Sequence, residues 1–316
     1  MKSVSWHILQ SVFLSNNMDA RNLGIGIIFL LQSTVGILGN ISILSYYLVI
    51  FYKKHKGKPM DLILVHMIIV NILIILSKGV PSTMTAFGLK LFFNDWSYQF
   101  FMYVLRVSRS MSIVTICLLS VFQTIIIIPR NSCWKNLRAK SPKGISLCIS
   151  LSWVLYIFIN VIFPLYMSVT LSEKNITEGT NFKLYTIVGY DKITVFLYIT
   201  FFVFPEILFS GLITWSSSSM IVILYRHKQR VQYIRSTHAS HSSSPESRAI
   251  QNILVLVFTF LTFYTLSAIS HTYNALFHYS NWWLINFTAI ITLCIPTSSP
   301  FVLMSQSFPL SKLCFL

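Results

Sequence analysis

The chain has 316 residues, of which 54% are apolar and only 10% are charged, and its formal net charge is +16. Such an excess of Lys and Arg in a soluble protein would suggest nucleic-acid binding, because basic patches neutralise phosphates. Here the charged residues are too few to cover a soluble surface, and they lie in the gaps between long apolar runs. We therefore expect a membrane protein and no nucleic-acid partner.

Seven apolar runs are each long enough to cross a hydrocarbon core of about 30 Å, which takes about 20 helical residues. The predicted fold is an all-α membrane protein, a seven-transmembrane helix bundle, with a short N-terminal segment (1–22), a transmembrane domain (23–304) and a short tail (305–316). The predicted spans are Leu23–Ile50, Leu62–Thr85, Phe100–Ile128, Ile145–Val169, Ile193–Tyr225, Ile250–Phe277 and Trp283–Met304.

Basic residues gather in alternate gaps between these runs. The first, third and fifth gaps hold four, five and five of them, whereas the second, fourth and sixth gaps together hold four. Because Lys and Arg concentrate in cytoplasmic loops, the odd-numbered gaps are expected to face the cytoplasm, with the N-terminus extracellular and the C-terminus cytoplasmic. The basic loops would then meet anionic membrane lipids and an intracellular protein partner.

The longest cytoplasmic connection, Arg226–Arg248, is rich in Ser, His and Arg and has no apolar periodicity, so a mobile loop is expected. Its end has the composition of a helix start. Ser244 can cap a helix, Pro245 suits the first helical position, and Glu246 suits the positive end of the helix dipole. Phosphorylation within Ser242–Ser244 is the alternative interpretation of this run.

The five cysteines are informative through their positions. None falls in a predicted extracellular loop, so no outer disulfide is expected, and Cys314 in the tail is either a palmitoylation site or a plain free thiol. Asn175 begins an Asn-Ile-Thr sequon in the fourth gap, which the charge pattern places outside the cell. We expect Asn175 to be glycosylated.

Charged residues inside the runs are expected to face the interior of the bundle, because a charge at mid-membrane costs about 2.5 to 3.5 kcal/mol on insertion scales. Arg106 and Arg109 lie three residues apart in the third run, on one helix face with Tyr103 and Ser110. Glu206 lies in the fifth run. These residues are the candidates for a functional site.

Two interpretations of the buried charges remain open. In the first, Arg106 and Glu206 form an ion pair that fixes helix packing; in the second, the charges anchor a ligand that enters from outside. Tyr264, His271 and Asn286 would line the same cavity, unless each is hydrogen-bonded internally. Lys78, near the outer end of the second run, is a further buried charge.

Prolines and uncharged polar residues predict local features of the bundle. Pro205 has no backbone donor and frees the carbonyl of Phe201, so the fifth helix is expected to kink there. Pro296 and Pro300 are expected to loosen the seventh helix. Hydrogen bonds between helices are expected from Asn40, Asn71, Thr297, Ser298 and Ser299.

The sequence contains no constellation typical of an enzyme. There is no His-Glu-x-x-His pair, no glycine-rich phosphate loop and no pair of carboxylates on one helix, so we expect no catalysis, no cofactor and no metal. A small-molecule transporter or channel is a second class that seven spans allow. The eight acidic residues offer few groups for ion coupling, and no half-to-half repeat is visible.

Short motifs occur along the chain from the first run to the tail. They are Gly36–Asn40, Leu76–Pro81, Ala86–Lys90, Cys117–Gln123, Asp191–Thr194, Arg226–Gln232, Ser243–Arg248, Phe263–Ser267, Asn281–Leu284 and Ser299–Met304. Together they resemble the vomeronasal type-1 receptors, a pheromone-receptor family within the seven-helix G-protein-coupled receptors. The Ser-Pro-Glu-Ser-Arg and Asn-Trp-Trp-Leu motifs favour this family over the type-2 taste receptors, which share its architecture.

The resemblance implies a multi-pass receptor in the plasma membrane. It would bind small pheromone-type molecules among the outer halves of helices three, five, six and seven and signal through a Gi/Go-class G protein. A solvated positive-inside face without specific contact to a G protein is the alternative explanation of the basic loops. The residues expected to face the G protein are Arg130, Lys135, Arg138, Arg226, Lys228, Arg230 and Arg235.

The chain departs from the pattern of the family at one important place. Where the family usually has two cysteines joined outside the membrane, this chain has Tyr98 and either Tyr185 or Thr186. Their joint absence implies a freer outer loop, Leu171–Tyr190, above the pocket. The third run also ends in Val121-Phe122-Gln123-Thr124 without the acidic-Arg-Tyr triplet of the larger receptor class, so that class's activation switch is not expected here.

Overall fold

Seven long helical stretches make up most of the described chain. The computed structural model describes the backbone of residues 20–54, 59–89, 95–127, 135–166, 168–171, 185–188, 199–235, 245–276 and 282–307. The helical stretches are α2 (Ala20–Lys54), α3 (Pro59–Ile74) continuing through the π-helical η1 (Ile75–Gly79) into α4 (Val80–Ala86), α5 (Asp95–Ile127), α6 (Lys135–Tyr166), η3 (Ile199–Val203) continuing into α8 (Phe204–Arg235), α9 (Pro245–Leu276) and α10 (Trp282–Ser307).

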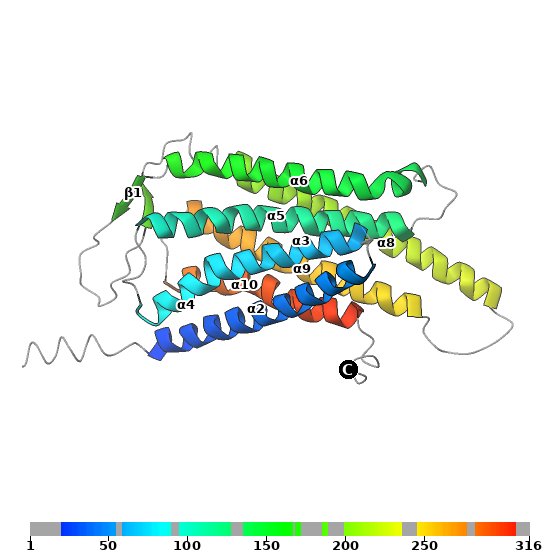
Figure 1. Ribbon diagram of the computed structural model, residues 1–316, viewed down its shortest axis with the longest axis horizontal. Coiled ribbons are helices and arrows are strands. Elements are labelled where there is room, and N and C mark those ends of the chain that lie inside the picture. The colour runs from blue at the N-terminus through cyan, green and yellow to red at the C-terminus, as the bar shows by residue number, and fades with distance from the viewer. Residues whose placement is uncertain are drawn as a thin grey trace, which may run out of the picture.

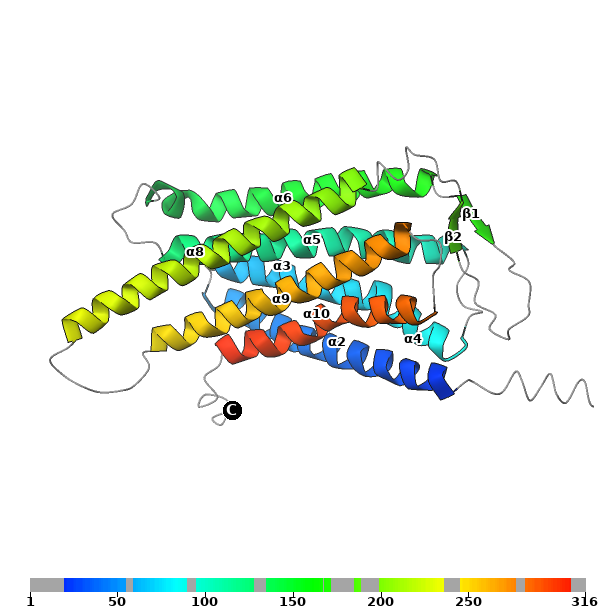
Figure 2. The ribbon, with the colours of Figure 1, turned by 180° about the vertical axis from the view of Figure 1, so that it is seen from behind.

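The helices run alongside one another as a single bundle (Figure 1). The antiparallel strands β1 (Ser168–Leu171) and β2 (Tyr185–Val188) lie at one end, which we call the hairpin end. Figure 2 shows α8 projecting beyond the other helices at the opposite end. α5 contacts α3, α6, α8 and α9, so its side chains meet those of four neighbours in the middle of the bundle.

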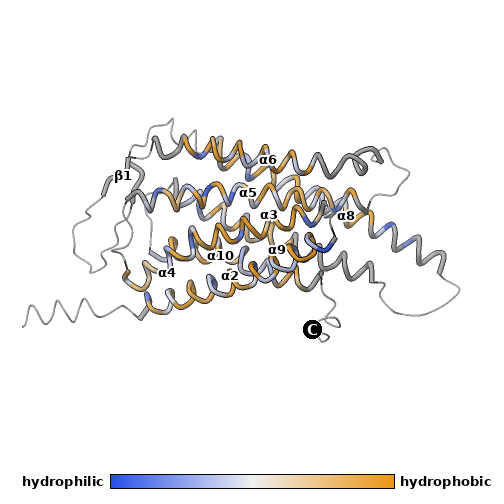
Figure 3. Tube along the Cα trace, in the orientation of Figure 1, coloured by the Kyte–Doolittle hydropathy of each residue, from blue (hydrophilic) through white to orange (hydrophobic). Residues whose placement is uncertain are grey.

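The composition of these helices is that of membrane spans. Among the described residues, six helical stretches are long and apolar enough to cross a membrane: α2, α3 to α4, α5, α6, α8 and α10. α9, which is 32 residues long, occupies the place of the predicted sixth span. Apolar residues follow the helices along their length (Figure 3), and large side chains such as Leu38, Phe158 and Trp215 are exposed where lipid would cover them. The predicted seven-helix bundle is confirmed.

Several helices extend beyond the predicted spans, and α6, for example, begins at Lys135 instead of Ile145. The fourth span was expected to reach Val169, but α6 ends at Tyr166 and Val169 lies in β1, where β-branched residues pair with β2. The fifth helix was expected to end at Tyr225, but α8 continues to Arg235. Arg, Lys and Gln are good helix formers, so a segment without apolar periodicity can still be helical.

Both π-helical segments precede a proline. The carbonyl four residues before Pro81 belongs to Ser77, inside η1, and the one before Pro205 belongs to Phe201, inside η3. A proline ring has no N–H and crowds that carbonyl, so the preceding turn widens. A kink was predicted at Phe201, and the structure has a π-helical turn there. α10 keeps α-helical geometry through Pro296 and Pro300, so the loosening expected there does not appear as a change of helix type.

Buried amides join three helices, as the sequence predicts. Asn40 of α2 donates to the carbonyl of Pro296 at 2.8 Å, and Asn71 of α3 donates to Asn40 Oδ1 at 3.3 Å and to Ser299 Oγ of α10 at 2.6 Å. Thr297 donates to the Gln32 carbonyl of α2 at 3.2 Å. α9 begins at Pro245, as the first-turn proline predicts, whereas Ser244 lies outside the described residues.

Candidate functional site

An ion pair between Arg109 of α5 and Glu206 of α8 lies in the hairpin half of the bundle. Arg109 Nε donates to Glu206 Oε1 at 3.0 Å, and Nη2 lies 3.0 Å from the same oxygen. Only 12% of the Arg109 side chain and 21% of the Glu206 side chain are exposed. One of the two interpretations of the sequence paired Glu206 with Arg106, whereas the ion pair described here is with Arg109, one helical turn further along α5. Spacing within α5 groups the two arginines on one face but does not fix the depth of α8 beside them.

The geometry of this pair leaves part of the arginine unsatisfied. Nε and Nη2 both approach Oε1, so the guanidinium and the carboxylate do not form two parallel bonds to two oxygens. The buried Nη2 makes no hydrogen bond within the described residues, because its N–H directions miss Oε1 although the charges are close. A buried donor of this kind favours an acceptor group beside it.

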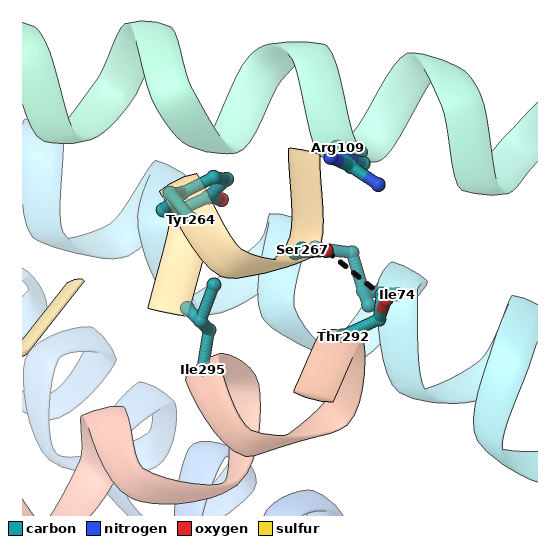
Figure 4. Close-up of a pocket in the computed structure, with 6 residues that line it drawn as sticks. All are labelled: Ile74, Arg109, Tyr264, Ser267, Thr292 and Ile295. Carbon is teal, nitrogen blue, oxygen red and sulfur yellow. Dashed lines mark hydrogen bonds between the residues drawn. The ribbon is translucent and has the colours of Figure 1, made fainter. Parts of the chain in front are cut away.

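A small cavity opens beside Arg109 (Figure 4). About 210 Å³ of space among its lining side chains is not filled by protein atoms, but this volume includes the open mouth, and the enclosed part has room for only about one water molecule. Four helices contribute its walls, α3, α5, α9 and α10. The lining residues are Ile74, Arg109, Tyr264, Ser267, Thr292 and Ile295.

One wall of the cavity is a hydroxyl network centred on Thr292. Thr292 Oγ1 lies 2.7 Å from the Thr288 carbonyl, 3.2 Å from Ser267 Oγ and 3.1 Å from His271 Nε2. A carbonyl only accepts, so the single hydroxyl proton of Thr292 points to Thr288. Ser267 and His271 then donate to Thr292, which places the imidazole proton on Nε2 and leaves Nδ1 as an acceptor.

The predicted pocket residues divide into two groups. Arg109 and Tyr264 line the cavity, and His271 and Glu206 are bonded to residues that line it. Tyr103 instead donates to the Ile157 carbonyl of α6 at 3.2 Å, and Asn286 donates to Trp282 within its own helix at 2.9 Å. The remaining two, Arg106 and Ser110, are half-buried on α5 and are not among the lining residues.

Sequence reasoning missed Ser267 and Thr292. A signal for Ser267 was present, because Tyr264, Ser267 and His271 follow one another at helical spacing and share a face of α9. Thr292 has no such signal, since only the packing of α10 against α9 brings it to His271.

The predicted G-protein-facing residues lie at the opposite end of the bundle where they are described. Arg226 is exposed on α8, and Lys135 and Arg138 begin α6. Lys228, Arg230 and Arg235 lie on the projecting part of α8. Three other predicted positions, Arg130, Asn175 and Cys314, lie outside the described residues. The cysteines that the structure describes, Cys117, Cys148 and Cys294, are free and lie within the spans.

Several known proteins are similar to this chain in sequence or in fold. The model of the Vomeronasal organ pheromone receptor family matches residues 23–316. Human "Vomeronasal type-1 receptor 2" is 45% identical over 285 residues, covering 90% of this chain and 72% of the relative. Human "Vomeronasal type-1 receptor 4" is 41% identical over 298 residues, covering 94% and 99%. The zebrafish (Danio rerio) "Olfactory receptor class A-like protein 1" is 26% identical over 284 residues, covering 89% of each.

Among solved structures, a crystal structure of squid rhodopsin superposes with a TM-score of 0.67 at 15% identity, covering 94% of this chain and 83% of rhodopsin. At that identity the likeness shows the fold alone, which is the seven-helix receptor fold. The family match resolves the choice that the motifs left open with the type-2 taste receptors. The chain belongs to the Vomeronasal organ pheromone receptor family and is a multi-pass receptor of the plasma membrane with the fold of a G-protein-coupled receptor.

Proposed function

We propose that this receptor binds small pheromone-type molecules in the hairpin half of its bundle and signals through a Gi/Go-class G protein. The observation that carries the binding site is the buried Nη2 of Arg109, a charged donor without a hydrogen bond in the described chain, beside a cavity walled by four helices. Ligand sites of this kind combine apolar walls with a few placed polar groups. Here Ile74 and Ile295 are the apolar walls, and Arg109, Ser267 and Thr292 are the polar groups.

The charges at the two ends of the bundle support an orientation in the membrane. α2 ends at Lys53 and Lys54 at the end opposite the hairpin, where α6 begins with Lys135 and the basic part of α8 projects (Figure 1). This distribution supports a cytoplasmic face at that end and an extracellular hairpin end, since Lys and Arg concentrate in cytoplasmic loops. The ion pair of Arg109 with Glu206 would then lie in the extracellular half of the bundle, and anionic lipids would meet the basic end.

The contact between α5 and α8 offers a route from ligand to G protein. Besides the ion pair of Arg109 with Glu206, the two helices share a hydrogen bond between Thr124 and Ser216, whose hydroxyl oxygens are 2.7 Å apart. Thr124 lies 15 residues beyond Arg109, about 22 Å along the helix. A ligand that favours one position of α8 relative to α5 would shift the population of the state that the G protein binds.

The direct test is release of G-protein subunits in cells. Cells expressing the receptor with Gi or Go subunits are exposed to urinary, steroidal and volatile fractions, and release of the subunits is measured by energy transfer. We expect one or more fractions to release Gi/Go subunits only in cells that express the receptor. Ligand-dependent solute flux in cells without a G protein would instead favour a transporter or channel.

A second test concerns the basic end of the receptor. Arg226, Lys228, Arg230 and Arg235 are replaced by Gln, which preserves helix-forming propensity in α8 but removes the charges. The variant is expected to reach the surface and bind ligand but to release subunits less efficiently. Unchanged coupling at equal surface expression would remove the proposed contact and leave these residues as a positive-inside face.

A further inference from the structure

The outward face of α8 is unusual for a helix that meets only lipid. Of the six helical stretches that are apolar enough to span a membrane, α8 has the lowest hydropathy and the smallest buried share. Polar residues of a span normally face the bundle, because hydrocarbon offers them no hydrogen bonds. In α8, however, Thr214 and Ser218 are exposed, and Figure 2 shows no helix over the near side of α8. Small and hydroxyl-bearing residues of this kind are typical of contacts between membrane helices.

Trp215 is exposed on this face at a depth where hydrocarbon would surround it. Its exposed fraction is 77%, and it lies between Glu206 and Arg226, about 14 Å from the first and about 16 Å from the second along the helix. Tryptophans that face lipid gather at the membrane interfaces, where the indole N–H can meet water, and the exposed Trp283 lies in this way at the hairpin end of α10. Within the described residues Trp215 makes no hydrogen bond. Its N–H therefore lacks an acceptor that lipid tails cannot supply.

An empty position lies one turn from Trp215. Gly211 is exposed, and no heavy atom lies within 4 Å of the place that a Cβ would occupy. Gly211, Trp215 and Ser218 follow one another at steps of four and three residues, the repeat that keeps one side of a helix against a second helix. Leu208 and Val222, each 50% exposed, continue this repeat in the two directions. We call these five residues the α8 seam.

We propose that a second copy of this receptor docks on the α8 seam, with the two α8 helices parallel and a two-fold axis along the membrane normal. Two copies in one membrane share an orientation, so this symmetry is the one that lets a face meet itself in a closed pair. In knobs-into-holes packing, residue 215 of each copy enters a hole formed by residues 211, 214, 215 and 218 of the other. Three of these four residues, Gly211, Thr214 and Ser218, are small, which leaves room for the indole of Trp215.

The α8 seam is complementary to itself, which favours a second copy over lipid or a different protein. Each copy supplies a large side chain and an empty position, Trp215 and Gly211, and each supplies the indole donor and the Ser218 hydroxyl as its acceptor. A lipid tail could cover Gly211 but could not accept a hydrogen bond. Glu206 and Ser216, which bond to α5, lie on the other side of α8. The pairing therefore leaves the candidate ligand site untouched and does not depend on the proposed function.

Dimerisation is measured with full-length receptors that carry donor and acceptor fluorophores, in lipid vesicles over a range of protein-to-lipid ratios. We expect energy transfer to rise with receptor density and to give a dissociation constant. Trp215→Leu and Gly211→Leu should each raise this constant at least about tenfold, because the first removes the inserted side chain and the second fills the hole. Phe158→Leu, which changes a similarly exposed aromatic residue of α6, is the matched control and should have no effect.

Two results of this measurement would overturn the proposal. One is energy transfer no higher than that of an unrelated monomeric membrane protein at the same density. The other is a dissociation constant that either α8 replacement leaves unchanged.

Oxidative cross-linking locates the contact with a replacement that hardly changes the side chain. Equivalent residues at the centre of a parallel helix pair approach within disulfide range, so Ser218→Cys should form a covalent dimer in vesicles. The exposed Cys148 is first replaced by Ser to remove background reaction. Leu151→Cys, at an exposed position of α6, is the control. We expect Ser218→Cys to cross-link at least about tenfold faster than Leu151→Cys, and similar rates would contradict a contact through α8.

Discussion

Asn71 of α3 donates a 2.6 Å hydrogen bond to Ser299 Oγ of α10, and with its second N–H it reaches Asn40 Oδ1 of α2 at 3.3 Å. All three side chains are buried, and Asn71 is 1% exposed. One amide therefore ties together three helices that are distant in sequence. These polar contacts lie about one helical turn from Ile74 and Ile295, which line the cavity, on the side away from the hairpin.

Replacing Asn71 tests how much this connection contributes to the stability of the receptor. Asn71→Leu keeps the side-chain size but removes both donors, leaving Asn40 and Ser299 without those partners in an apolar setting. We expect a loss of about 1 to 2 kcal/mol in stability, measured as a lower unfolding temperature in nanodiscs. Asn286→Leu is the control, because its bond stays within α10, and it should cost less. Equal effects of the two replacements would show that the link between helices adds nothing.

Gly79 lets η1 and α2 approach closely. A Cβ at this position would collide with Ser33 Oγ of α2 and come to 3.4 Å from Leu293 of α10. Gly79→Ala should therefore destabilise the receptor by about 1 to 3 kcal/mol, and Ser33→Ala should restore much of that loss by removing the hydroxyl. Gly24→Ala is the control, since nothing lies within 4 Å of its added Cβ. Failure of Ser33→Ala to rescue Gly79→Ala in thermal unfolding would contradict the packing seen here.

The ion pair of Arg109 and Glu206 should show strong coupling in a double-mutant cycle. Glu206→Gln leaves the Arg109 charge uncompensated, and we expect a loss of about 3 kcal/mol, since removing one partner of a buried pair is costly. Arg109→Gln with Glu206→Gln should recover most of this stability, because no isolated charge remains. Additive losses of thermal stability would mean that the two side chains act independently.

Filling the cavity should weaken ligand binding while the receptor still reaches the cell surface. Ser267→Leu adds side-chain volume between Ile74 and Arg109, so ligand potency in the subunit-release assay should fall at least about tenfold while surface expression is retained. Thr262→Leu, at an exposed position of the same helix, adds similar volume outside the bundle and is the matched control. A Ser267→Leu receptor with unchanged potency would place the ligand elsewhere.

The sequence predicts the bundle well because membrane insertion depends on length and hydropathy, which are properties of one segment at a time. The seven spans, the irregular turn before Pro205 and the polar contacts of Asn40, Asn71 and Thr297 follow from such local properties and from depth. The extension of α8 to Arg235 was missed because this segment has no apolar periodicity, which was the signal used to predict the spans.

The candidate site could be predicted only in part. Sequence spacing brings Arg106 and Arg109 to one face of α5, but the choice between them depends on how far α8 slides along that face. The helix-breaking effect of Pro205 widens the turn before Glu206 and adds to this uncertainty of register. In the same way, Thr292 meets His271 only through the packing of α9 on α10, which no single helix encodes.

The central claim is that Arg109 has two roles: it forms an ion pair with Glu206, and it also contacts the ligand. The most direct measurement compares the dose–response of Gi/Go subunit release for the native receptor and for Arg109→Gln with Glu206→Gln, at equal surface expression and with unfolding temperatures checked to match. The account predicts that the double variant, although as stable as the native protein, loses potency at least about tenfold. Unchanged potency in this variant would contradict it and leave the pair with a structural role alone.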